Sequence, residues 1–190
     1  MMSSKKVLVL GVLVVLAVVH RWWPHPPNFT PVMAIALFAG ALVRPWQLAL
    51  FVPILSLFIS DMALGFHDQM LGVYLSFALA VLVGREVGAR QNSRWGWAMR
   101  LSGGVVASSV VFFLVSNFFV WAFSGMYARS LSGLVQSYVM AIPFFHRELA
   151  GNFFYSFILF GGYEFVRRFF LRPVSTPQIQ KESQSSLGEL

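Results

Sequence analysis

The stretch from residue 48 to residue 83, LALFVPILSLFISDMALGFHDQMLGVYLSFALAVLV, decides the fold. It contains two apolar runs, 48–64 and 70–83, with a short polar turn around His67 between them. A helix of about 20 mostly apolar residues is long enough to cross a hydrocarbon core about 30 Å thick. The stretch therefore predicts two antiparallel transmembrane helices joined by a tight turn.

Further apolar runs at 7–19, 31–43, 101–123 and 149–166 extend this pattern along the chain. We expect helices over 6–23, 31–43, 47–64, 70–88, 101–123 and 148–170. Only 11% of the 190 residues are charged and the mean hydropathy is +0.70, whereas soluble domains have about 25% charged residues. The sequence thus predicts an all-α membrane protein: one six-helix transmembrane domain over 1–172 and a disordered cytoplasmic tail over 173–190, rich in Ser, Gln and Pro.

Three segments depart from the simple pattern. The apolar run 31–43 is short and rich in alanine, which favours close packing inside the protein or against a partner over contact with lipid. Residues 128–142 alternate apolar and polar side chains with helical periodicity, so we expect an amphipathic helix on the outer surface, ended by Pro143. The basic segment 85–100 is expected to be a loop at the cytoplasmic interface.

The basic residues sort to one side when the connections between the apolar runs are assigned alternately to two sides. Because cytoplasmic connections attract Lys and Arg, the richer side is expected to be cytoplasmic, with both termini on it. This placement also explains the formal charge of +7 without a nucleic-acid partner. Eleven basic residues fall on the richer side: Lys5, Lys6, Arg44, Arg85, Arg90, Arg94, Arg100, Arg167, Arg168, Arg172 and Lys181. The outer side has only three: Arg21, Arg129 and Arg147.

The outer side carries polar residues close to the ends of apolar runs, of which Asp61 is the sharpest example. An ionisable group at membrane depth is costly and is usually buried, paired and functional. We expect Asp61 to pair with His67, Arg129 or Arg147; the alternative is a residue that only caps the turn. Asn117, near the outer end of its helix, either contacts a ligand or makes an interhelical hydrogen bond.

A second polar group lies at the start of the last apolar run. Glu148 and Asn152 are four residues apart, so they share one face of a helix, and Tyr155 can extend that face. Glu148 is also well placed to stabilise a helix N-terminus. The pair therefore forms either a helix cap or a polar rim facing a pocket.

Metal and enzyme chemistry have weak support in the sequence. His25, His67 and His146 fall on the outer side with Asp61, but they lack the local spacing of metal ligands. The chain has no cysteine, which excludes disulfides and thiolate sites. No nucleophile or phosphate-loop motif is present. We therefore expect no enzyme, no cofactor and no metal site.

Several segments together resemble an uncharacterised bacterial membrane protein family that is similar to the substrate-binding S components of energy-coupling-factor vitamin transporters. The resemblance covers roughly residues 25–165. Its segments are NFTPVMAIALFAGA (28–41), SDMALGFH (60–67), VYLSFA (73–78), SNF (116–118), MY (126–127) and YVMAIPFF (138–145).

The resemblance implies six helices in the bacterial cytoplasmic (inner) membrane, both termini cytoplasmic, and a ligand pocket near the outer surface. It also implies docking of a small-residue helix face on a transmembrane coupling subunit that is driven by two ATPases. S components often carry Ala-x-x-x-Ala in their first helix. Here the first helix has no such pattern, and the nearest small-residue face is formed by Ala36 and Gly40.

The preferred hypothesis is a membrane protein that binds a small, vitamin-like nutrient for uptake, by binding and release without covalent chemistry. The alternatives are a structural membrane scaffold, and a metal transporter or membrane enzyme that uses Asp61 and the outer histidines. The expected ligand-binding residues are Asn28, Phe29, Asp61, Phe66, His67, Asn117, Tyr127, Glu148, Asn152 and Tyr155.

Overall fold

The computed structural model describes residues 4–24, 26–88 and 94–170. These residues form six helices and no strand, which confirms the all-α prediction. The helices are α1 (Ser4–Trp22), α2 (Val32–Leu42), α3 (Trp46–Leu64), α4 (Met70–Val87), α5 (Arg94–Phe123) and α6 (Leu131–Phe170). Three of them, α3, α4 and α5, are long and apolar enough to cross a membrane, and α1 and α2 carry shorter apolar stretches.

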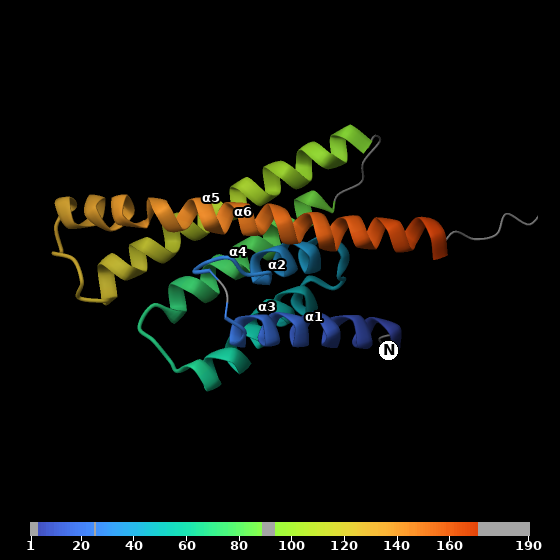
Figure 1. The fold of residues 1–190 in the computed structure, drawn as a ribbon, viewed down its shortest axis with the longest axis horizontal. Helices are drawn as coiled ribbons and strands as arrows, with labels where there is room; N and C mark the ends of the chain where they lie inside the picture. Colours follow the sequence, from blue (N-terminus) through green and yellow to red (C-terminus); the bar gives the residue numbers. More distant parts are fainter. Residues whose placement is uncertain (1–3, 25, 89–93, 171–190) are drawn as a thin grey trace, which may run out of the picture.

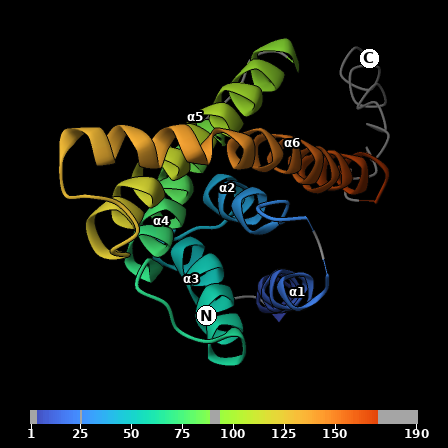
Figure 2. The same cartoon turned by 60° about the vertical axis from the view of Figure 1, so that its left-hand side comes forward.

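Helix α2 lies at the centre of the molecule. All ten residues from Val32 to Ala41 are buried, and α2 contacts each of the other five helices. Figure 2 shows α2 surrounded by α1, α3, α4 and α6. The expectation that this short, alanine-rich helix packs inside the protein is therefore confirmed.

Glycine makes the α2–α4 contact unusually close. A Cβ atom added to Gly84 of α4 would overlap the carbonyl oxygen of Leu37 in α2 and lie 3.0 Å from the Leu37 Cα. A Cβ added to Gly40 of α2 would overlap the carbonyl oxygen of Val81 in the same way. The two backbones thus touch at this crossing, as small residues allow in membrane proteins.

The outside of the bundle is apolar. Phe51 of α3, Leu71 of α4, Met99 of α5 and Phe157 of α6 are each at least 60% exposed. Large apolar side chains are exposed on all six helices, whereas soluble proteins rarely expose large apolar patches. Together with the membrane-length helices, this surface supports a protein that lies in a lipid bilayer.

Helices α5 and α6 differ from their expected boundaries. Helix α6 runs without a break from Leu131 to Phe170 and contains Pro143, so the prediction of a separate outer helix over 128–142 is wrong. A proline within a helix removes one hydrogen bond and kinks the backbone, but helices in membrane proteins tolerate it. Helix α5 begins at Arg94 and α4 extends to Val87, so much of the expected basic loop 85–100 is helical.

The long α5–α6 pair extends beyond the other four helices at one end, as Figure 1 shows. Peripheral α1 packs mainly on α3. The expected disordered tail, 173–190, lies outside the described residues.

Candidate functional site

A pocket exists at one end of the bundle because α2 is short. Its 11 residues span about 16 Å, whereas α3 with 19 residues spans about 28 Å. Helix α1 ends at Trp22 and α2 begins only at Val32, so α2 does not fill the full depth between its neighbours. The space beyond its N-terminus is where the pocket lies.

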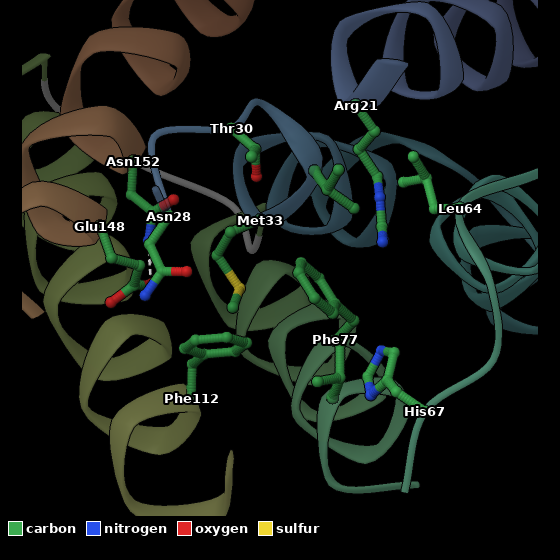
Figure 3. Close-up of a pocket in the computed structure, with 12 residues that line it drawn as sticks. Arg21, Asn28, Thr30, Met33, Leu64, His67, Phe77, Phe112, Glu148 and Asn152 are labelled. Carbon is green, nitrogen blue, oxygen red and sulfur yellow. Dashed lines mark hydrogen bonds between the residues drawn. The ribbon is translucent and has the colours of Figure 1, made fainter. Parts of the chain in front are cut away.

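The pocket has a volume of about 340 Å³ and is lined by the connection before α2 and by all six helices. Figure 3 shows an elongated arrangement: Asn28, Glu148 and Asn152 gather at one side, and Arg21, Leu64 and His67 lie at the opposite side. Apolar side chains separate these two polar groups. The lining residues are Arg21, Asn28, Thr30, Val32, Met33, Leu64, His67, Val73, Phe77, Phe112, Glu148 and Asn152.

The connection between α1 and α2 is held in place by Asn28 and Phe29. Asn28 adopts a positive φ of 62°, a conformation that asparagine tolerates better than most residues. The Phe29 ring packs on Phe154 and Tyr155 of α6, with centroids 5.9 and 5.5 Å away. It lies so close to Gly151 that a Cβ there would be 3.1 Å from the ring. These contacts hold Phe29 against α6, and Figure 3 shows the neighbouring Asn28 beside Asn152 of that helix.

The basic end of the pocket is built around an ion pair. Arg21 Nη2 donates to Asp61 Oδ1 over 2.6 Å, and the Tyr74 hydroxyl donates to Asp61 Oδ2 over 2.9 Å. Asp61 itself is 1% exposed. The expectation that Asp61 pairs with His67, Arg129 or Arg147 is therefore wrong. The end of α1 packs on α3 and places Arg21 next to Asp61.

The acidic end is built on α6. Asn152 donates its side-chain amide to Glu148 Oε1 and, over 2.8 Å, to Ser109 Oγ of α5. Glu148 is 5% exposed and Asn152 is 1% exposed. The prediction that Glu148 and Asn152 share a face is confirmed. Glu148 does not stabilise a helix N-terminus, because α6 begins well before it, at Leu131.

Four of the predicted ligand-binding residues line the pocket: Asn28, His67, Glu148 and Asn152. Asp61 lies behind Arg21, and Tyr155 holds His20 of α1, with 2.6 Å between its hydroxyl and His20 Nε2. The remaining predicted residues have other surroundings.

Asn117 donates to the Phe113 carbonyl over 2.8 Å, a bond within its own helix and not the interhelical bond given as the alternative; it is not among the residues that line this pocket. Phe66 is 65% exposed, and Tyr127 belongs to the α5–α6 connection. Ala36 and Gly40, the expected docking face, are buried in the protein's own core, where Gly40 abuts α4.

The other eight lining residues were not predicted: Arg21, Thr30, Val32, Met33, Leu64, Val73, Phe77 and Phe112. The apolar members resemble ordinary core residues in sequence and become pocket walls only through tertiary packing. Arg21 did carry a signal. It is a basic residue on the side where basic residues are scarce, next to the apolar run 7–19, and such a residue at the membrane boundary is expected to have a partner.

The described part of the chain contains no cluster of metal-binding side chains that would support the metal alternative. There, no three His, Asp or Glu side chains lie close enough together to hold an ion. His25, one of the histidines considered for such a site, lies outside the described residues.

The chain belongs to a family of unknown function, DUF6580, whose match covers residues 2–178. No curated protein and no solved structure matches the chain.

Proposed function

We propose that this member of the DUF6580 family binds a small nutrient in the pocket and takes part in its uptake across a bacterial cytoplasmic membrane. The observation that carries the proposal is the pocket of about 340 Å³ with polar groups at two ends and apolar walls between them. Sites for small molecules are mostly apolar with a few placed polar groups, and they occur between the helices of bundles. Binding and release without covalent chemistry would suffice for this role.

The proposal includes the arrangement in the membrane. With six crossings and both termini in the cytoplasm, the sorting of Lys and Arg turns the pocket end of the bundle to the outside. A nutrient could then reach the pocket from outside the cell. If a coupling subunit with two ATPases drives release, as the resemblance to S components implies, it would contact a surface other than Ala36 and Gly40, which are buried.

The proposal predicts a ligand that copurifies with the protein and is lost when the pocket is filled. Val73 of α4 lines the pocket, so Val73→Phe should place the added ring in the ligand's space. We expect native mass spectrometry in mild detergent to show a bound small molecule on the parent protein and none on this variant. Val106→Phe is the matched control, because Val106 of α5 is 42% exposed and tolerates a larger side chain.

A parent protein that carries no bound molecule, and whose unfolding temperature is unchanged by a panel of vitamins and metal ions, would contradict the proposal. That result would favour the scaffold alternative. Equal occupancy in the Val73→Phe variant would show instead that the ligand binds elsewhere.

A further inference from the structure

One oxygen of the pocket carboxylate has no hydrogen-bond partner in the described part of the chain. Glu148 Oε1 accepts the hydrogen bond from Asn152, whereas Glu148 Oε2 is buried and has no hydrogen-bond partner among the described residues. Buried polar atoms in folded proteins nearly always have partners, and an exception calls for an explanation. Because Glu148 lines the pocket, a bound molecule is the natural source of the missing partner.

The charges around the pocket show which sign that partner should have. Arg21 is paired with Asp61, so the basic end is already neutralised within the protein. In the described part of the chain, Glu148 has no basic partner. The adjacent Arg147 is exposed and is not among the lining residues. The lining therefore has one carboxyl group without a basic partner among the described residues, and burying its ionised form is costly unless a ligand supplies the counter-charge.

The surroundings of Glu148 suit an organic cation better than a metal ion. Among the described residues no third acidic or histidine side chain joins it to make a metal site. Figure 3 shows Asn28 beside Glu148 and the Phe112 ring and Met33 on the side toward the pocket centre. A side-chain amide can accept a hydrogen bond from an ammonium group, and an aromatic ring face attracts a cation.

We propose that the ligand carries a positively charged nitrogen, bound by the Glu148 carboxylate with Asn28 beside it, on a flat apolar body that lies between Met33, Phe77 and Phe112. This inference rests on the proposed function and specifies its substrate class: an organic amine or amidine with an apolar body. Asn152 and Ser109 are positioning residues: Asn152 donates to the Glu148 carboxylate, and Ser109 orients Asn152 by accepting its second hydrogen bond.

Three indole probes with the same ring and different head charges test the inference. Tryptamine is a cation, tryptophol is neutral and indole-3-acetate is an anion. Binding to the purified full chain in detergent is measured by calorimetry. We expect tryptamine to bind at least tenfold more tightly than tryptophol, with indole-3-acetate weakest. Glu148→Gln should lower the affinity for tryptamine at least tenfold, which corresponds to about 1.4 kcal/mol. The affinity for tryptophol should change by no more than about twofold, because tryptophol carries no charge.

The matched control is Glu164→Gln on the same helix, because Glu164 pairs with Arg167 at the surface and does not line the pocket. It should leave all three affinities unchanged. Retained tryptophol binding shows that the Glu148→Gln variant is folded. If that variant binds none of the three probes, the Glu148→Asp variant is measured instead. Because aspartate keeps the carboxylate, this variant must still bind tryptamine more tightly than tryptophol.

Equal affinity for tryptamine and tryptophol would mean that Glu148 acts as a neutral hydrogen-bonding group, and would overturn the inference. A preference for indole-3-acetate, or no binding of any probe, would overturn it as well. The proposed function fails separately, when neither a copurified molecule nor any compound of the vitamin panel occupies the pocket of the parent protein.

Discussion

Replacing Gly84 by alanine is expected to destabilise the protein by about 3 kcal/mol or more, at the upper end of the cost of overpacking a core. The added methyl group would overlap the backbone carbonyl of Leu37 in α2, and a backbone cannot move aside as a flexible side chain can. Native proteins are stable by only about 5–15 kcal/mol. The variant should therefore accumulate poorly and unfold at a clearly lower temperature in detergent.

Gly161→Ala is the control for this prediction. Gly161 is also inside a helix, but a Cβ atom added there has nothing within 4 Å. Alanine is the better helix former by about 1 kcal/mol, so this variant should be as stable as the parent or slightly more so. If Gly84→Ala matched Gly161→Ala in unfolding temperature, the close approach of α2 and α4 would be refuted.

Replacing Asp61 by asparagine is expected to cost about 3 kcal/mol of unfolding free energy, toward the low end for removing one partner of a buried ion pair. The cost arises because the Arg21 guanidinium, whose side chain is only 18% exposed, loses its counter-charge. Adding Arg21→Gln should recover most of the loss, because the second change removes the unpaired charge. Chemical or thermal unfolding of the single and double variants measures this coupling.

The surface pair between Glu164 and Arg167, whose side chains are 27% and 58% exposed, gives the comparison. Surface ion pairs contribute about 1 kcal/mol at most, so Glu164→Gln should hardly change stability. Additive effects of Arg21→Gln and Asp61→Asn, with no recovery in the double variant, would argue that the two side chains do not interact.

The parts of the fold that depend on local pattern could be predicted from the sequence. The apolar runs indicated the helices, and the small residues of 31–43 indicated a helix inside the protein. Whether a helix ends at Pro143 could not be decided from the local pattern. Pro143 costs one hydrogen bond, and the apolar contacts of α6 on both sides of it outweigh that loss, which is a tertiary effect.

In the candidate site, too, the contacts within one helix could be predicted and the contacts between helices could not. Glu148 and Asn152 are neighbours on one helix face, so their pairing followed from a spacing of four residues. Asp61 and Arg21 are 40 residues apart, and their pairing depends on how α1 packs against α3. Asn117 looked equally polar in the sequence, but its own helix offers the Phe113 carbonyl as a partner. Tertiary packing decides which polar residues face the same pocket. The spacing of residues along the sequence does not carry this information.

The central position of α2 also bears on how the protein is made. Helix α2 leaves the ribosome before α4, its main packing partner. Alone in a bilayer, a helix of 11 residues is too short to bring the unpaired backbone groups at both of its ends to water. If α2 lies within the membrane, we therefore expect it to be held stably only after α4 has been synthesised.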